Sequence, residues 1–396
     1  MKLQSDVPQL RVRTIRAAEL TPEVVQAWAD LEARSLHSNA FLSPYFILPS
    51  IRHLTSDKNI LILLVESPSP YELHSVGIFE RKYLSLIWPL PFLTAYQPPH
   101  SYLNGLLIDR RNPREIITAL YDYFSRHKFR YNFVDLHLHP ECKHTEEVHS
   151  ALAQTYPLQW QKTGTVRRAI LRPESAGEDY LQTRRKGLYQ DCMRRLRQLS
   201  KTGSVTWHYL TGEDVTHDTV ERFLELEHKG WKGTEGSSLT SSPSHTTFFR
   251  EMVDGFQSQH RVFFTELRLN GRAIASTCNL ISGKAGFGFK LGWDPEYARY
   301  APGILNAFQL TLHAPTYCKN MEMIDSCSSP QAFINNLWLE QRSLVTSAYT
   351  TSFLGNFSLQ IDRRTRRVIR TMNKLGNWVS SKKGGVSAIP VGRLNG

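Results

Sequence analysis

The segment that decides the fold is GFGFKLGWDPEYARYAPGILNAF, from Gly286 to Phe308. Its first part, up to Trp293, is rich in aromatic residues and predicts a strand. A loop follows, and Pro302 and Gly303 then open an apolar run that predicts a helix. A strand that leads through a turn into a helix N-terminus forms an anion site, because free backbone N–H groups and the positive helix end face the ligand. Arg299 adds a positive charge there, and Gly303 allows close approach of the backbone.

The residues around this segment predict a layered arrangement of strands and helices. Upstream, the apolar spacing predicts two helices and then two strands joined by the Asn270-Gly271 hairpin turn. Downstream, the helix from Pro302 is followed by a short strand. The predicted elements are helices at Val220–Glu227 and Phe248–Phe256, and strands at Val262–Leu269, Ala273–Ile281, Gly286–Trp293 and Met321–Asp325.

Residues 20–140 repeat this order. Thr21-Pro22-Glu23 begins a helix with a capping hydroxyl and a proline in the first turn, and Asn112-Pro113 begins another. The predicted strands are Ile60–Val65, Leu73–Phe79, Tyr83–Trp88 and the segment from Phe133 to Leu136. The chain is therefore predicted to be a tandem of two related α+β or α/β domains, at residues 1–160 and 161–350, with a basic C-terminal helix and tail at 351–396.

Charge is concentrated in two segments. The chain has 48 Lys and Arg against 36 Asp and Glu, a net charge of +12. Arg184–Lys201 contributes +6 and Arg363–Lys383 contributes +8, so the remainder is about −2. The apolar spacing from Leu181 to Ser200 predicts one basic amphipathic helix connecting the domains, and Arg363–Lys374 predicts another. Such patches favour anionic partners: phosphorylated cofactors, anionic lipid or nucleic acid.

Cysteine usage and hydropathy indicate the compartment. Five widely spaced cysteines without a CxxC pair fit reduced thiols better than a disulfide framework or a structural zinc site. The N-terminus has no apolar signal region, and the longest apolar-rich run, Tyr83–Tyr96, is short and interrupted by prolines. We therefore expect a cytoplasmic protein that is not an integral membrane protein, in peripheral contact with the inner face of the membrane if the basic tail binds lipid.

Three segments carry a resemblance to a known family. Trp293–Gly303 resembles the hallmark of the BioF2-like (CelD-like) acetyltransferases, a family of the GCN5-related N-acetyltransferase (GNAT) superfamily that is also similar to the FemAB transferases. Phe223–Gly233 resembles the family's helix and the Trp/Lys/Gly segment that follows it. Ile324–Cys327 and Leu337–Arg342 resemble its closing strand and Trp-containing end.

The resemblance implies a tandem GNAT fold, in which each domain is a mostly antiparallel mixed sheet flanked by helices. It also implies acetyl-CoA or another acyl-CoA as donor, with no metal. It places the pyrophosphate at Arg299–Ile304 and the pantetheine arm along Phe287–Gly292. The implied donor-binding residues are Phe289, Leu291, Arg299, Tyr300, Ala301, Pro302, Gly303 and Ile304. The general superfamily loop has glycine or alanine where this chain has Pro302 and Ile304. The identity of the donor therefore stays open, because the similar FemAB transferases use aminoacyl-tRNA instead of acyl-CoA.

Direct transfer from a thioester requires a base for the acceptor and an acid for the leaving thiolate. Carboxylates near the strand ends are the candidate bases: Glu227, Asp294 and Asp325, with His228 behind them; Tyr300 is the candidate acid. Asp294 and Asp325 are equally suited to capping the turns that follow them. Cys327 suits packing better than attack on a thioester.

The predicted function is acyl transfer, most simply of acetyl, to an amino or hydroxyl group of a sugar, a polysaccharide precursor or a lipid-linked acceptor. The N-terminal domain is predicted to be degenerate and to shape the acceptor cleft, because Asp109–Pro113 precedes its helix without a glycine. Two alternatives remain: a FemAB-type transferase that uses aminoacyl-tRNA, and a non-catalytic protein that binds nucleic acid or a membrane.

Overall fold

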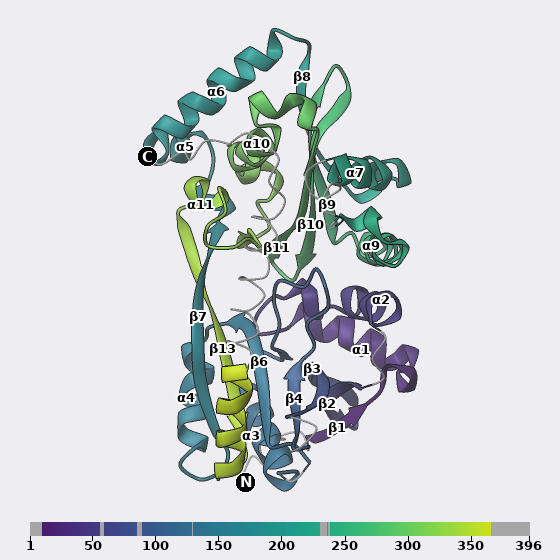
Figure 1. Ribbon diagram of the computed structural model, residues 1–396, viewed down its shortest axis with the longest axis vertical. Helices are drawn as coiled ribbons and strands as arrows, with labels where there is room; N and C mark the ends of the chain where they lie inside the picture. The colour runs from purple at the N-terminus through teal and green to yellow at the C-terminus, as the bar shows by residue number, and fades with distance from the viewer. Residues whose placement is uncertain are drawn as a thin grey trace, which may run out of the picture.

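The computed structural model describes residues 10–55, 59–84, 89–128, 130–229, 236 and 238–365. One twisted sheet runs the length of these residues, with helices on both faces (Figure 1). Its strand order is β1-β2-β3-β4-β6-β13-β7-β12-β11-β10-β9-β8, and β5 pairs with β3. The pairs β4·β6 and β11·β12 are parallel and the others are antiparallel, so this is a mixed, mostly antiparallel sheet, as predicted.

The order of elements repeats. The first repeat contains β1 Arg11–Ile15, α1 Pro22–Ala33, α2 Pro44–Leu54, β2 Ile60–Pro68, β3 Tyr71–Tyr83, β4 Pro91–Ala95, β5 Leu106–Ile108, α3 Pro113–Arg126, β6 Phe133–Pro140, α4 Lys143–Leu152 and β7 Gln159–Leu171. The second contains β8 Val205–Thr211, α7 His217–Lys229, α9 Pro243–Gln257, β9 Val262–Leu269, β10 Arg272–Ser282, β11 Ala285–Trp293, α10 Pro302–Tyr317, β12 Met323–Asp325, α11 Ile334–Leu337 and β13 Glu340–Thr350. Apart from β5, the two sets correspond one to one, with one parallel pair in each, which agrees with the predicted tandem of GNAT-like units.

The two repeats exchange their last strands. β7 closes the sheet of the second repeat by pairing with β12, and β13 closes that of the first by pairing with β6. β7 and β13 also pair with each other, from Gln159 opposite Thr350 to Ile170 opposite Glu340. They form the long ribbon that joins the upper and lower parts of Figure 1. The boundaries at 160 and 350 stay a prediction.

Local signals in the sequence account for many element ends. The Thr21 side chain accepts a hydrogen bond from the Val24 N–H at the start of α1. Asn270 and Gly271 both have positive φ, as the tight β9–β10 turn requires. One prediction was wrong: Leu181–Ser200 is not one helix but α5 (Glu178–Arg184) and α6 (Lys186–Ser200), interrupted at Arg185. The break lies beside Gly187, a residue type that costs about 1 kcal/mol relative to alanine in a helix.

Apolar cores cover both faces of the sheet. On one face α1, α2, α7 and α9 surround a core shared by the two repeats, in which Phe46 packs edge-on against Phe248 with 5.5 Å between ring centroids. On the opposite face of the second repeat α10 covers another core (Figure 1). A buried ion pair between Glu32 and Arg261 also links the repeats, and Ser282 donates a hydrogen bond to Glu32 at 2.6 Å. The repeats are thus packed together as well as joined by strands.

Two predictions fall partly outside the described residues. β3 continues to Tyr83, and 85–88 of the predicted strand Tyr83–Trp88 are not described. Residues 353–365 are helical and expose 91% of Phe353, but most of the basic segment Arg363–Lys383 lies beyond them. Among the helices described, none is both long enough and apolar enough to cross a bilayer.

Candidate active site

A cavity opens where β11 and β12 separate. The two strands pair in parallel only from Ala285 opposite Met323 to Phe287 opposite Asp325. β11 then continues to Trp293, whereas the chain leaves the sheet at Ser326. The resulting gap is a cavity of about 230 Å³ between β11, α10 and the segment that follows β12. Strand separation in the middle of a sheet exposes backbone to a ligand, which is why such positions hold binding sites.

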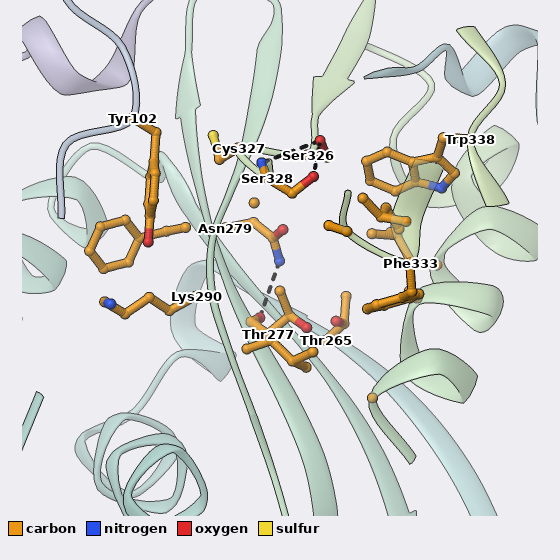
Figure 2. A pocket seen from close by; sticks show the side chains of 18 residues that line it. Tyr102, Thr265, Thr277, Asn279, Lys290, Ser326, Cys327, Ser328, Phe333 and Trp338 are labelled. Carbon is orange, nitrogen blue, oxygen red and sulfur yellow. Dashed lines mark hydrogen bonds between the residues drawn. The ribbon is translucent and has the colours of Figure 1, made fainter. Parts of the chain in front are cut away.

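The cavity passes through the sheet. Phe289 and Cys327, in its lining, belong to the core shared by the two repeats. Leu310, Ile334 and Trp338, also in its lining, belong to the core on the α10 face. Figure 2 shows Tyr102 and Lys290 on one side and Phe333 and Trp338 on the other. Two ligands can therefore approach one point from opposite faces of the sheet.

The floor of the cavity is polar and ordered by hydrogen bonds. Thr265, Thr277 and Asn279 line it (Figure 2). Behind them, the side-chain amide of Asn306 donates to the hydroxyl oxygens of Thr265 and Thr277, each at 3.0 Å. The indole N–H of Trp207 donates to Asn306 Oδ1 at 2.9 Å. Because the neighbours fix these hydroxyl groups, the floor can position a polar ligand group.

The segment after β12 forms the opposite wall. The backbone N–H of Cys327 donates to Asp325 Oδ1 at 2.7 Å, which holds Cys327 at a φ of 50°. The hydroxyl oxygens of Ser326 and Ser328 lie 2.9 Å apart. Asp325 therefore shapes this wall from behind and does not itself line the cavity.

Two protonated groups line the cavity. Burial raises the pKa of the Tyr102 hydroxyl, and the charges of Cys327 and Glu227 raise it further, although Arg168 lowers it. Burial also raises the pKa of the Cys327 thiol well above its ordinary range. At neutral pH both side chains keep their protons, so Tyr102 is a proton donor and Cys327 is a poor nucleophile.

The N-terminus of α10 lies at one end of the cavity. Ala301 adopts the left-handed conformation (φ 53°, ψ 58°), and Pro302 begins the helix. A Cβ atom on Gly303 would lie 3.0 Å from Leu291 Cδ2, so glycine permits the close approach of α10 to β11. The exposed Arg299 lies over the Tyr300 ring at 4.6 Å, and the guanidinium of Arg195 on α6 donates to the Arg299 carbonyl at 3.2 Å. Two arginines thus flank the positive end of the helix.

The structure brings part of the predicted donor site to the cavity. Phe289, Leu291 and Gly303 line it. The other five donor-site residues form the turn and first helical turn next to it: Arg299, Tyr300, Ala301, Pro302 and Ile304.

The predicted catalytic residues lie around the cavity rather than in its lining. Glu227 is buried on α7, where its Oε2 accepts from the Leu239 N–H at 2.8 Å. Burial raises the pKa of Asp294, but Lys229, the Glu296 N–H and Arg272 hold it below its ordinary value. Asp294 thus caps η6 (Pro295–Tyr300), at 3.2 Å from the Glu296 N–H, and binds two cations.

Tyr300 is buried in the core on the α10 face, and His228 Nδ1 lies 2.9 Å from the Ser238 hydroxyl oxygen. The catalytic roles of Glu227, Asp294, Asp325 and Tyr300 stay predictions.

Sequence reasoning missed Tyr102 and Asn279, and it included Lys290 only as part of the strand predicted to carry the pantetheine arm. Lys290 is the only charged side chain in the lining that the structure describes, and a lysine among apolar strand residues was the signal for it. Tyr102 comes from the loop between β4 and β5 in the other repeat. No local pattern links it to β11, because the contact exists only once the repeats pack together.

The turn before α3, which corresponds to α10 in the first repeat, is occupied by internal ion pairs. Asp109 is fully buried and binds Arg34 at 2.8 Å and Arg111 at 2.6 Å. Arg111 also binds Glu72 at 2.6 Å. Arg111, in this turn, and Arg34 are thus neutralised by carboxylates within the protein.

The histidines of β6 have protein partners. His137 Nε2 lies 3.1 Å from Asp135 Oδ2, and His139 Nε2 lies 2.7 Å from the Ser347 hydroxyl oxygen. Across the described residues, no three His, Cys, Asp or Glu side chains are grouped as metal ligands would be.

Comparison with known proteins agrees with this fold. A model of the family described as "Acetyltransferase (GNAT) domain" matches residues 185–325, which include β8 to β12 and α10. Among solved structures, FemX is similar, with a TM-score of 0.55, 8% identity, and coverage of 88% of this chain and 100% of FemX. L-PGS from Bacillus licheniformis has a TM-score of 0.51 and 12% identity, covering 88% of this chain and 97% of that one.

A protein of unknown function from Bacteroides thetaiotaomicron has a TM-score of 0.51 and 10% identity, covering 86% of this chain and 98% of that one. No curated protein matches the chain in sequence. At these identities the likeness establishes the fold alone: a GNAT-like mixed sheet flanked by helices.

Proposed function

We propose that this protein transfers an acyl group, most simply acetyl, from acyl-CoA to an amino or hydroxyl group. The observation that supports this most directly is the cavity through the sheet at the β11–β12 separation, with the α10 N-terminus at one end. The family match over residues 185–325 supports acyltransferase chemistry of the GNAT type.

The residues around the cavity fit an acyl-CoA donor. The α10 N-terminus, with Arg299 and Arg195 beside it, suits a pyrophosphate. The apolar wall at Leu310, Ile334 and Trp338 suits an extended, weakly polar arm. Gly303, which lines the cavity without a side chain, lets the arm approach the backbone at the start of α10.

The proposed chemistry requires positioning and proton transfer. An acyl thioester supplies an activated carbonyl, so no covalent enzyme intermediate is required, which agrees with the protonated Cys327. Beyond Phe287 β11 no longer pairs with β12, and we propose that backbone N–H groups on this edge stabilise the developing oxyanion. Tyr102 would give its proton to the leaving thiolate. Glu227, whose charge acts on Tyr102, remains the proposed base, acting through water.

The acceptor would approach from the side of the first repeat, where Tyr102 and Lys290 lie (Figure 2). A sugar, a polysaccharide precursor or a lipid-linked intermediate with an amino or hydroxyl group is the proposed class, and the basic tail would keep the protein near an anionic membrane surface.

Calorimetric titration with acetyl-CoA tests the donor. We expect micromolar binding by the wild type and its loss in the double variant Arg299→Ala/Gly303→Val, with an unchanged circular dichroism spectrum. Arg197→Ala, which removes an exposed arginine of α6 bonded to the Met193 carbonyl, is the control. If neither acetyl-CoA nor longer acyl-CoA binds, the proposal fails, and salt-dependent binding of aminoacyl-tRNA would favour the FemAB-type alternative.

A further inference from the structure

Two buried arginines share one carboxylate beside the cavity. Arg168 on β7 and Arg342 on β13 lie directly opposite each other in the strand register. Their side chains are only 6% and 12% exposed. Arg168 Nη1 lies 3.7 Å from Asp325 Oδ1, and Arg342 forms an ion pair with the other oxygen of the same carboxylate. One positive charge is thus left over in a buried cluster, where charge is costly.

Several hydrogen-bond donors of this cluster have no partner among the described residues. They are Nε and Nη1 of Arg168, Nε of Arg342, and the neighbouring ring atom Nε2 of His37. The Nη2 atom of Arg342 is held by its ion pair with Asp325. A buried charged donor without an acceptor destabilises the fold. These atoms are buried, so an anionic ligand would act through the accessible part of Arg342, where it would offset the extra positive charge of the cluster.

A second cavity, of about 440 Å³, reaches one member of the cluster, Arg342. Arg342, His37 and Lys143 line it, as do Glu141 and Glu146. Both glutamates are already held by one lysine: Lys162 forms an ion pair with Glu141 and lies 3.8 Å from Glu146.

The full charge count around this second cavity favours an anion. The charged residues of the lining balance, with Arg342 and Lys143 against Glu141 and Glu146. The groups that pair with them, Arg168 and Lys162 against Asp325, leave one positive charge in excess. Burial, followed by the charge of Arg342, lowers the pKa of His37, so its ring is neutral at pH 7 and can donate one hydrogen bond. One more negative charge would balance the set.

The same cluster is in direct contact with the walls of the active-site cavity. Arg168 Nη2 donates to the Tyr102 carbonyl at 2.9 Å, and Asp325 directly precedes Ser326. The Arg342 guanidinium lies 5.8 Å from the centre of the Phe287 ring, one residue before Gly288 in the cavity lining. A molecule bound in the second cavity therefore lies on the first repeat's side of the reaction point.

We propose that the second cavity binds an anionic oxygen group, a carboxylate or a phosphate, of the acyl acceptor, through Arg342 and His37 with Arg168 behind them. This inference rests on the proposed function for the role of the ligand, but not for its binding. The acceptor is then an amino or hydroxyl compound that also carries a negative charge.

Anion binding is measured on the full chain without any acyl transfer. The probes are inorganic phosphate, followed by ³¹P line broadening, and ¹³C-labelled acetate, followed by ¹³C line broadening, each with coenzyme A added to occupy the donor site. We expect at least one probe to bind the wild type, and Arg342→Gln to weaken that binding tenfold or more. The probe that responds distinguishes a phosphate acceptor from a carboxylate acceptor. Arg167→Gln is the matched control, because Arg167 is exposed on the same ribbon.

A second variant covers the case in which Arg342→Gln does not fold. His37→Phe keeps every charge but removes the ring N–H donor, and it should also weaken binding of the probe. The inference is overturned if neither probe binds, or if both variants bind like the wild type. Acetyl-CoA affinity should be unchanged in Arg342→Gln. If the wild type does not bind acetyl-CoA at all, that result counts against the proposed function, whereas the anion measurement still tests this inference.

Discussion

The guanidinium of Arg195 donates a hydrogen bond to the carbonyl oxygen of Arg299 at 3.2 Å. This contact joins the basic connector, α6, to the turn that precedes α10. It places one charge of the Arg184–Lys201 segment next to the proposed phosphate site. The basic connector is therefore part of the site's surroundings and not only an exposed helix face.

Replacement of Arg195 should weaken binding of the acyl donor without affecting the fold. We expect Arg195→Ala to reduce acetyl-CoA affinity about 5- to 30-fold, the value of one charge-assisted contact of roughly 1–2 kcal/mol. Calorimetry at two salt concentrations measures it, and the loss should shrink as salt screens the charge. An equal effect of Arg197→Ala on the same helix would contradict the assignment.

Tyr102 should act in the chemical step. Because burial raises its pKa, the hydroxyl stays protonated throughout the neutral and mildly alkaline range. We expect Tyr102→Phe to lower kcat by about 100-fold while acetyl-CoA affinity changes less than threefold. Tyr209→Phe removes the hydroxyl of a partly buried tyrosine of the second repeat that is outside the cavity lining, and it should leave kcat near the wild-type value. A parallel loss of affinity in Tyr102→Phe would indicate a binding role instead.

Gly292 should be sensitive to a single added methyl group. A Cβ atom at Gly292 would lie 2.5 Å from the Glu227 backbone nitrogen and 2.8 Å from its Cα, both on α7. Backbone cannot move aside as a flexible side chain can, so we expect Gly292→Ala to reduce the free energy of unfolding by about 1–3 kcal/mol. Urea denaturation measures this. Gly164→Ala is the control, because a Cβ atom at Gly164 would lie 3.9 Å from its nearest neighbour, Thr346 Cβ. Its free energy of unfolding should fall much less than that of Gly292→Ala.

Two buried histidines should make stability fall in acid. Burial lowers the pKa of His149 to about 3 and of His139 to about 4, against about 6.5 in the unfolded chain. Below pH 6.5 the unfolded state binds protons that the folded state does not. The contribution of these two histidines to the free energy of unfolding is therefore complete above pH 6.5 and is lost as the pH falls.

Denaturation at pH 6.5 and pH 5 tests this behaviour. We expect the free energy of unfolding to drop by about 1–2 kcal/mol for each such histidine over this interval. His149→Phe should reduce the drop because it removes one of the two titrating groups. Phenylalanine can keep the stacking on Trp160, where the ring centroids are 4.8 Å apart, so the variant should stay folded. An unchanged slope in His149→Phe would show that other groups cause the loss.

Prediction from sequence succeeded where the signal was local. Thr21, Asn270-Gly271 and Pro302 are found at the helix start, hairpin turn and helix start that their chemistry requires. The prediction of one connecting helix was wrong because the apolar spacing continues through Arg185, whereas the helix is interrupted at that residue. Periodicity records which face is buried and says little about whether a helix is continuous.

The sequence by itself determined the repeated order of elements, the mostly antiparallel sheet and the strand–turn–helix segment with Arg299 and Gly303. These depend on contacts between near neighbours, on turn chemistry and on apolar alternation. Only the tertiary structure decided the exchange of β7 and β13, because the pairing of strands far apart in the chain depends on packing that no local pattern encodes. The same exchange places Arg168 opposite Arg342 around Asp325, and packing of the repeats brings Tyr102 to the cavity.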